Sequence, residues 1–457
     1  MLTAFSYATL ALPLLLAVVL GLALPLLGLL LYSRFVLGVV YVVLVFLCDA
    51  VFVGNVRLNL GLNLYTNDLA FGLLGAVATA RWCVAGDMPA RSKSWLLFVL
   101  LFLVGLGLGL AQYGTRAGVQ ARDFFYAIVA ASYFMSFTVD EHRVQQFLRV
   151  LAASAWVLLP LCVYRWTVAF WPLPDLLPPG GAWSPDGATR VITSNETLAL
   201  AQLLLLGLMF PGSGQAVRPL RFAAPLLLAA VVALQHRSVW VAGLIGVVSA
   251  FALMRSASGS RAGQLLALVV VVSLTAVPAV LSERLTGVSR EVGQSASTAL
   301  AGQGSVHSRL EDWQQTLKEW SRAGPRAWLI GYGFGRDTTR LLLNESGERR
   351  VVRFGTHNHY IALLTNTGLL GLTAFLALVA WVLKGLYTLC RAGQAGAVAP
   401  TLLTLIIMQL AYYVPYGGDT LQHALLGLAV AFVASQRNMK LPLGSAAPTA
   451  LKKPAFA

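Results

Sequence analysis

Charged residues are scarce in this sequence. Asp, Glu, Lys and Arg make up 11% of the 457 residues, whereas a soluble globular protein contains about 25%. Hydrophobic residues make up 58%, and the mean hydropathy is +0.73. Several apolar runs reach about 18 residues or more, which is the length of a transmembrane helix, and they lack the alternation of barrel strands. We therefore predict an all-α, polytopic membrane protein.

Cysteine is also rare, and common catalytic motifs are missing. Cys48, Cys83, Cys162 and Cys390 lie in or beside apolar runs without a CxxC pair, which favours packing residues over metal ligands or disulfides. No HExxH, GxSxG, Walker or Rossmann pattern occurs, which argues against zincins, serine hydrolases and nucleotide-driven transporters. Carboxylates Glu311 and Asp312 have no third ligand at metal spacing. We expect no metal, no cofactor and no nucleic-acid partner.

The apolar runs define the predicted spans. They lie near residues 8–31, 35–53, 68–84, 95–112, 123–138, 147–171, 191–210, 222–235, 238–254, 264–281, 359–384, 400–416 and 420–435. The first run contains Pro13, Gly21 and Pro25, so it is either one kinked helix or a re-entrant hairpin. Thirteen crossings follow from the first alternative and about twelve from the second, which we prefer.

Lys and Arg in the short loops set the predicted orientation. One side carries Arg34, Arg91, Lys93, Arg143, Arg149, Arg218, Arg221, Arg255, Arg261, Lys384, Arg391, Arg437 and Lys440, and the positive-inside rule makes it cytoplasmic. The predicted organisation is transmembrane helices in 1–281, a periplasmic loop domain in 282–358, transmembrane helices in 359–437 and a cytoplasmic tail in 438–457. Residues 54–67 and 113–122 fall in the outer loops.

The outer side is unexpectedly rich in arginine. The net charge is +15, and the positive-inside rule accounts for only part of this excess. The outer arginines are Arg116, Arg122, Arg190, Arg237, Arg284, Arg290, Arg309, Arg322, Arg326, Arg336, Arg340, Arg349, Arg350 and Arg353. This accumulation indicates an anionic ligand on that side.

Residues 356–371 (THNHYIALLTNTGLLG) place a polar cluster directly before a long apolar helix. His357 at such a boundary is a candidate general base, with Asn358 and Tyr360 as supporting residues. The alternative is that these residues only cap the helix at the headgroup level. His359 lies two residues further on, so a helix directs it to another face. His236, His307 and His423 are other candidate bases.

Three arginines are candidate anion ligands. Arg237 lies in a tight turn between two apolar segments, where a guanidinium either snorkels or binds phosphate oxygens in a bidentate manner. Arg190 precedes a helix whose start Asn195 could cap, and a cation there opposes the helix dipole unless an anion is bound. Arg309 starts the amphipathic stretch 308–322 (SRLEDWQQTLKEWSR), where its alternative role is an ion pair with Asp312.

Five features in a fixed order resemble those of the bacterial O-antigen ligases and Wzy-type polymerases. In chain order they are Arg190 with Asn195, HRS at 236–238, SRLEDW at 308–313, GYGFG at 331–335 and HNHYIALLTNTGLLGL from His357. The resemblance covers roughly residues 190–375. Two departures are Ile361, where Leu is usual, and Asn366, where an acidic residue is common.

The resemblance implies a GT-C-like fold in the bacterial inner membrane and transfer of O-antigen from undecaprenyl pyrophosphate to lipid A–core on the periplasmic face. It implies an inverting, metal-independent reaction in which Arg190, Arg237 and Arg309 bind the donor pyrophosphate and His357 acts on the acceptor hydroxyl. A Wzy-type polymerase, a protein O-oligosaccharyltransferase and a polyprenyl-lipid transporter remain alternatives. The oligomeric state is not indicated by the sequence.

Overall fold

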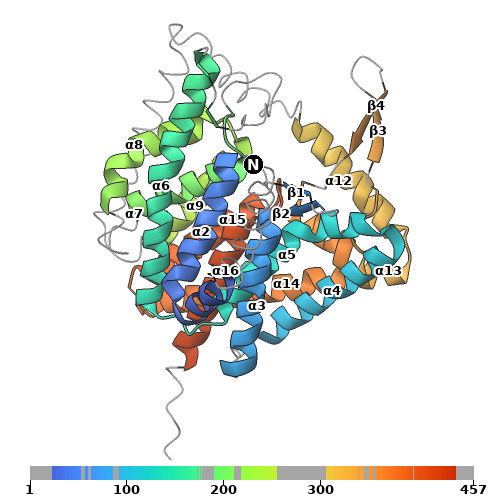
Figure 1. Ribbon diagram of the computed structural model, residues 1–457, viewed down its shortest axis with the longest axis horizontal. Coiled ribbons are helices and arrows are strands. Elements are labelled where there is room, and N and C mark those ends of the chain that lie inside the picture. Colours follow the sequence, from blue (N-terminus) through green and yellow to red (C-terminus); the bar gives the residue numbers. More distant parts are fainter. Residues whose placement is uncertain are drawn as a thin grey trace, which may run out of the picture.

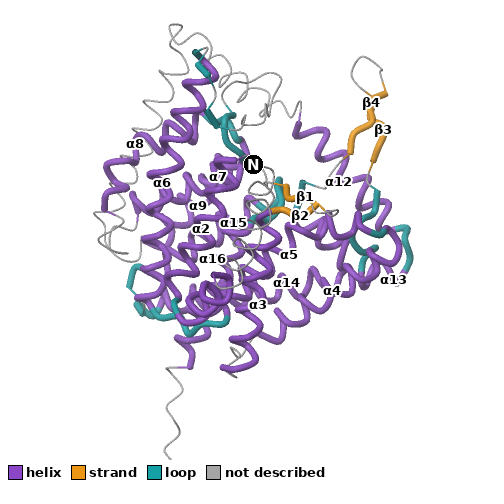
Figure 2. Tube along the Cα trace, in the orientation of Figure 1, coloured by secondary structure: helices purple, strands orange, loops and turns teal. Residues whose placement is uncertain are grey.

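The computed structural model describes residues 23–52, 57–59, 63–85, 92–171, 173–174, 176–177, 190–209, 218–254, 305–337, 339–343, 349–353, 357–394 and 396–438. The predicted span 264–281, most of 8–31 and the tail after Asn438 lie outside these residues. Within the described part, the chain is a bundle of helices with two short hairpins (Figures 1 and 2).

The helices follow the hydropathy pattern closely. They are α2 (Phe35–Phe52), α3 (Thr66–Ala85), α4 (Ser92–Tyr113), α5 (Thr115–Met135), α6 (Glu141–Phe170), α7 (Ser194–Met209), α8 (Arg218–Ala233), α9 (Arg237–Met254), α12 (Ser305–Ser321), α13 (Pro325–Ile330), α14 (His359–Arg391), α15 (Val398–Tyr412) and α16 (Thr420–Asn438). The predicted helical class is confirmed. The prediction of a loop at 113–122 is wrong, because α5 begins at Thr115 and includes Arg116 and Arg122.

Four of the described helices are long and apolar enough to cross a membrane: 35–52, 93–113, 141–169 and 359–391. Shorter apolar helices occupy 23–33, 219–233, 237–253 and 398–412. Together they support a multi-pass membrane protein. The count of about twelve crossings and the GT-C-like fold stay predictions.

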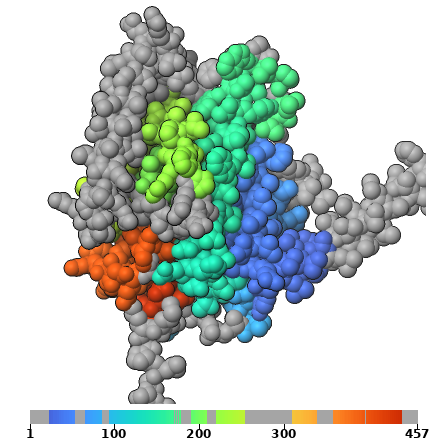
Figure 3. Space-filling model, turned by 90° about the vertical axis from the view of Figure 1, so that its left-hand side faces the viewer, coloured from blue at the N-terminus to red at the C-terminus, as the bar shows by residue number. Residues whose placement is uncertain are grey.

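Helix α16 is the centre of the bundle. Every residue from Leu421 to Ala434 is buried, because α16 packs against α5, α2, α14 and α15. On one face of the molecule, α6 lies between α2 and the α8–α9 region (Figure 3). The apolar sequence of α16 is therefore explained by contact with protein.

Helix α14 is kinked where a glycine-rich loop packs against it. Gly368 has φ 70° and ψ −172° inside the helix, and a Cβ there would lie 2.2 Å from the carbonyl oxygen of Leu329 in α13. The next turn of the loop is tied by Tyr332 N, which donates to the carbonyl oxygen of Thr365 at 2.7 Å. The GYGFG motif thus fixes α13 onto α14, a role in packing.

The predicted loop domain 282–358 is described in part. Its helix α12 spans the predicted amphipathic stretch, and the hairpin β3 (Thr339–Leu343) and β4 (Arg349–Arg353) pairs Thr339 with Arg353. A second hairpin joins β1 (Arg57–Asn59) to β2 (Asn63–Tyr65) in the predicted outer loop 54–67. In Figure 1, α12, α13, β3 and β4 lie together at one side of the bundle.

The bundle has two chemically different ends. At the site end, the start of α14 meets the residues after α15, where His359 N donates to the carbonyl oxygens of Tyr413 and Tyr416. The start of α7 meets the end of α15 through Ser194 and Tyr412, and the α8–α9 turn is tied to the segment before α7. At the opposite end, the C-terminal ends of α5 and α16 meet the start of α6, where Val139 N donates to Ser435 Oγ at 3.0 Å.

Candidate functional site

The α8–α9 turn brings two predicted arginines together. Gln235 has a positive φ of 52°, and its carbonyl oxygen accepts a hydrogen bond of 3.4 Å from Arg190 Nη2. Arg237 begins α9, close enough to Arg190 for their charges to repel. A site that holds two like charges side by side favours an anion between or beside them.

His236 in the same turn ties it to the segment that carries Arg190. The imidazole is buried, and its Nε2 donates to the carbonyl oxygen of Ile192 at 3.0 Å. Burial, together with the charges of Arg190 and Arg309, lowers the pKa of His236 to about 4. His236 is therefore neutral at pH 7 and serves to hold the turn.

Arg309 reaches the site from α12. Its Nη1 donates to the carbonyl oxygen of Pro415 at 3.4 Å and its Nη2 to the hydroxyl of Tyr416 at 3.3 Å. The guanidinium also lies 4.8 Å from the centre of the Tyr416 ring, a cation–π distance. The Arg309 guanidinium therefore points to the residues after α15. The ion pair with Asp312, which was the alternative role proposed from the sequence, does not explain its position.

Tyr416 links the parts of the site. Its ring stacks on Tyr412 with centroids 5.2 Å apart, and the Tyr412 hydroxyl contacts Ser194 Oγ at 2.6 Å and Asn195 Oδ1 at 2.9 Å. Asn195 therefore belongs to the site through a tyrosine and connects α7 to α15. Neither tyrosine was predicted from the sequence, although the aromatic residues around Pro415 and the Gly417–Gly418 pair (YYVPYGGD, 412–419) mark a helix end that could have indicated them.

His357 also lies against the Tyr416 ring. The two ring centroids are 6.2 Å apart in a T-shaped arrangement, and His357 has a positive φ of 30°. Its surroundings desolvate the ring, and this effect together with the charge of Arg309 lowers the pKa of His357 below its ordinary value. A neutral imidazole can accept a proton, so the state that a general base needs is the favoured one.

Asn358 and Tyr360 have structural partners. Asn358 is buried at the N-cap of α14, where its Oδ1 accepts a hydrogen bond of 3.0 Å from Ile361 N. The Tyr360 hydroxyl donates to the carbonyl oxygen of Leu410 at 2.9 Å. The capping interpretation therefore explains Asn358, and Tyr360 fastens α14 to α15.

His359 points into the protein, as its spacing from His357 predicts. The ring is buried, stacks on Phe124 with centroids 5.5 Å apart, and its Nδ1 accepts a hydrogen bond of 3.2 Å from Gly418 N. With the backbone bonds to Tyr413 and Tyr416, these contacts hold the 413–418 loop. His359 is thus a residue that positions Tyr416.

A cavity of about 320 Å³ opens beside His357. Three segments line it, namely α5, the start of α14 with the residues before it, and the loop after α15; the lining residues are Val119, Gln120, Asp123, Phe124, Ala127, His357, Asn358, His359, Ala362, Asn366, Gly417 and Gly418. His357 is therefore shared between this cavity and the arginine group.

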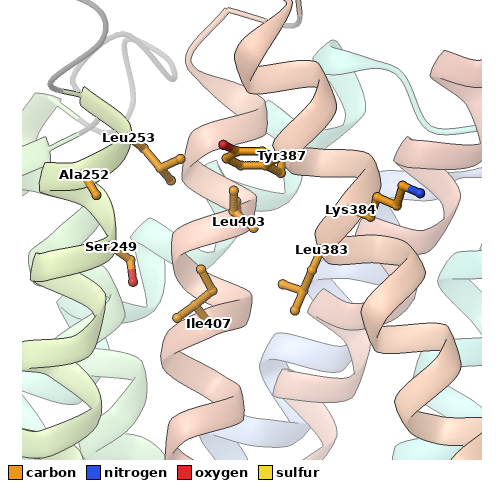
Figure 4. Close-up of a pocket in the computed structure, with 8 residues that line it drawn as sticks. All are labelled: Ser249, Ala252, Leu253, Leu383, Lys384, Tyr387, Leu403 and Ile407. Atoms are coloured by element: carbon orange, nitrogen blue, oxygen red, sulfur yellow. The ribbon is translucent and has the colours of Figure 1, made fainter.

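A larger cavity of about 530 Å³ lies further along α9, α14 and α15. Ser249 on its wall is about 18 Å along α9 from Arg237, at 1.5 Å per residue. Figure 4 shows Leu253, Leu383, Leu403 and Ile407 around it, with Tyr387 across its top and the amine of Lys384 pointing away. This cavity is apolar and offers space without reactive groups.

The predicted site residues fall into two sets. The structure brings Arg309 and His357 against Tyr416, with Asn195 one contact away, and places Arg190 and Arg237 beside the α8–α9 turn, where Arg190 and Arg309 both act on His236. Asn358 and Tyr360 lie next to this group but are engaged elsewhere. Among the described residues, no three His, Cys, Asp or Glu side chains are grouped to hold a metal ion.

The fold and the site define a multi-pass membrane protein with cations and a neutral histidine at one end of a helix bundle. Residues 222–376 match the family model described as O-antigen ligase, which supports membership of the chain in the O-antigen ligase family. The match begins in α8 and ends within α14, so it includes Arg237, Arg309 and His357. No curated protein matches the chain.

Proposed function

We propose that this protein transfers O-antigen glycan from undecaprenyl pyrophosphate to a sugar hydroxyl of lipid A–core at the periplasmic face of the inner membrane. The observation that carries this proposal is that a cation, Arg309, and a neutral base, His357, both lie against the Tyr416 ring. A leaving diphosphate needs the first and an attacking hydroxyl needs the second.

The step balances with these groups alone. The acceptor oxygen attacks the anomeric carbon of the donor sugar, and the bond from that carbon to the diphosphate oxygen breaks. His357 takes the acceptor proton as the new bond forms, because a sugar hydroxyl is too weak an acid to ionise first. Arg190, Arg237 and Arg309 stabilise the negative charge that develops on the diphosphate.

The division proposed from the sequence, with a loop domain in 282–358 between two sets of transmembrane helices, suits this role. The loop domain contributes Arg309 from α12 and His357 just before α14, while the helices that precede the loop contribute Arg237 at the start of α9. The donor's polyprenyl tail stays in the bilayer, so a site at the end of apolar helices is required.

Purified protein in detergent tests the proposal. It is incubated with undecaprenyl pyrophosphate-linked O-antigen and lipid A–core, and the products are separated by electrophoresis. We expect a lipid A–core band shifted by the glycan, and its absence in an otherwise folded protein would refute ligase activity.

Three further arms separate the alternatives. Donor alone would give longer lipid-linked glycan if the protein were a Wzy-type polymerase. A serine- or threonine-containing acceptor peptide would be glycosylated by a protein O-oligosaccharyltransferase. A fluorescent polyprenyl lipid would change leaflets in proteoliposomes, with no acceptor present, if the protein were a transporter.

A further inference from the structure

We infer that the cavity beside His357 binds the acceptor as a neutral sugar ring, with Asp123 of α5 accepting hydrogen bonds from its hydroxyls. This inference rests on the proposed function, since it names the part of the protein that receives the acceptor. It adds α5 to the site, outside the segments that carry the family resemblance and the family match.

Asp123 has a carboxylate available for a ligand. The residue is exposed toward the cavity, and within the described part of the chain its carboxylate has no hydrogen bond or ion pair. Its neighbour Arg122 is committed elsewhere: Arg122 Nε lies 3.0 Å from Asp68 Oδ1, and its guanidinium lies 4.2 Å from the centre of the Tyr65 ring.

Gln120 supplies the complementary donor. Its Oε1 accepts a hydrogen bond from Gly335 N of the GYGFG loop, which fixes the orientation of the amide. The other half of the side-chain amide, its Nε2 H₂ group, is a hydrogen-bond donor on the cavity wall one helical turn from Asp123. An acceptor and a fixed donor at this spacing match neighbouring hydroxyls of a sugar.

The rest of the wall suits a small polyhydroxylated ligand. Phe124 and Ala127 add apolar surface, and about 320 Å³ is at the lower end of the ~300–1,000 Å³ typical of small-molecule sites. A diphosphate is disfavoured here because the Asp123 carboxylate would repel it. The cavity and the arginine group are thus suited to different halves of the reaction.

The shared wall gives the cavity its place in the reaction. His357 lines the cavity and also contacts Tyr416, which Arg309 covers. A hydroxyl of a sugar held by Asp123 and Gln120 would then face the base, while the leaving group stays with the arginines. An attack of this kind suits inversion, in which the nucleophile and the leaving group occupy different sides of the anomeric carbon.

The test measures KM for acceptor and donor separately in the transfer assay. Asp123→Asn keeps the shape of the side chain but removes the charge that strengthens its hydrogen bonds to sugar hydroxyls. We therefore expect the KM for the acceptor glycolipid to rise about 10- to 100-fold, with the KM for the donor glycolipid unchanged. Val119→Trp, at an exposed position on the wall, should fill the cavity and produce the same pattern. The matched control is Asp337→Asn, an exposed carboxylate near Arg116, which should leave both constants unchanged.

A binding measurement removes the dependence on turnover. Core oligosaccharide released from lipid A by mild acid should give saturation-transfer NMR signals with the wild-type protein, and Asp123→Asn and Val119→Trp should lose them. If both variants transferred glycan at the wild-type rate with an unchanged acceptor KM, the inference would be overturned and the proposed function would stand. A rise in the donor KM would also overturn it, because the cavity would then belong to the donor. Absence of transfer by the wild type would refute the proposed function itself.

Discussion

The two ends of the helix bundle use arginine in different ways. At the opposite end, Arg81 donates to Ser136 Oγ at 2.9 Å, to the carbonyl oxygen of Ser136 at 3.1 Å and to the carbonyl oxygen of Tyr32, and lies 3.6 Å from the centre of the Phe137 ring. At the site end, Arg190 has one hydrogen bond of 3.4 Å to described residues, and Arg309 has two of 3.3–3.4 Å. The first arginine is satisfied by the fold, whereas the other two keep donors for a ligand.

Arg165 shows that position alone does not decide the role. It lies in α6 near the site end, yet its guanidinium donates to the carbonyl oxygens of Val191, Ala50 and Val51 at 2.8–2.9 Å. The bond to Val191 holds the segment that carries Arg190, and the other two hold the end of α2. A cation is a candidate ligand for an anion when its donors remain available, and a structural element when carbonyl oxygens fill them.

The largest effect is expected at His357. His357→Gln should reduce transfer by about 10²–10⁴-fold, because glutamine can orient a hydroxyl but cannot accept its proton. The measurement is the initial rate in the purified transfer assay, with donor binding followed in parallel as the control for an intact arginine site. Retention of most activity would make His357 a positioning residue only.

The arginine comparison is tested by a matched pair of variants. Arg309→Ala should lower transfer by about 10²–10³-fold, the loss typical of removing one preorganised donor, with little change in the melting temperature. Arg81→Ala should do the reverse, lowering the melting temperature while each folded molecule keeps its activity, because Arg81 satisfies carbonyl oxygens of the fold.

Arg309→Lys tests whether the charge of Arg309 or the shape of its guanidinium is needed, since a point charge does not reproduce the planar fork of a guanidinium. We expect its transfer rate to stay close to that of Arg309→Ala. A rate near that of the wild type would show that charge alone is sufficient at this position.

The pH profile should follow the charge of His357. A lowered pKa means that the base is neutral at pH 7, and protonation removes it only at a pH below the ordinary range of histidine. The transfer rate should therefore fall up to about tenfold per pH unit on the acid side. His236, with a pKa of about 4, is also neutral at pH 7.

Asp419 needs its own control in that experiment. Burial raises the pKa of Asp419 to about 7, so this carboxyl group also titrates as the pH falls from neutral. Asp419→Asn should keep the acid limb if His357 causes it. Loss of the limb in this variant would assign the titration to Asp419.

A smaller effect is expected at Tyr416. Tyr416→Phe removes the hydroxyl that accepts from Arg309 but keeps the ring that both Arg309 and His357 contact. We expect roughly a tenfold loss of transfer, in line with one hydrogen bond to a charged group. A loss as large as that of Arg309→Ala would indicate that the hydroxyl also contacts the substrate.

Hydropathy was sufficient to predict the apolar helices of the described part, because each apolar run must be buried in lipid or protein. It did not predict α13, which is short and lies between α12 and the GYGFG loop. It did not predict the start of α5, whose first turns carry Arg116 and Arg122 and read as a loop. Nor did it predict the kink at Gly368, which depends on contact with α13, far away in the chain.

The site was predictable to the extent that single residues were unusual where they stood. An arginine in a tight turn between two apolar segments is such a residue, and so is a histidine at a helix boundary. The roles of Tyr416 and Asp123 were not predictable, because they come from neighbours on other elements, although the aromatic residues of 412–419 mark the helix end that holds Tyr416. Asp123 lies in a helix that hydropathy places at a boundary, where a carboxylate is ordinary.

The smallest effect is expected at Asn358, which separates capping from chemistry inside the polar cluster. Its Oδ1 caps α14 by accepting from Ile361 N, and a serine or aspartate can replace an asparagine at such a position with little loss. Asn358→Asp should therefore keep stability and most transfer activity, while Asn358→Ala should lower the free energy of unfolding by about 1 kcal/mol. The measurements are thermal unfolding in detergent and the transfer rate of each variant. A variant that melts like the wild type but has lost transfer would place the amide nitrogen of Asn358 on the substrate, and the polar cluster would then contain two functional residues beside one another.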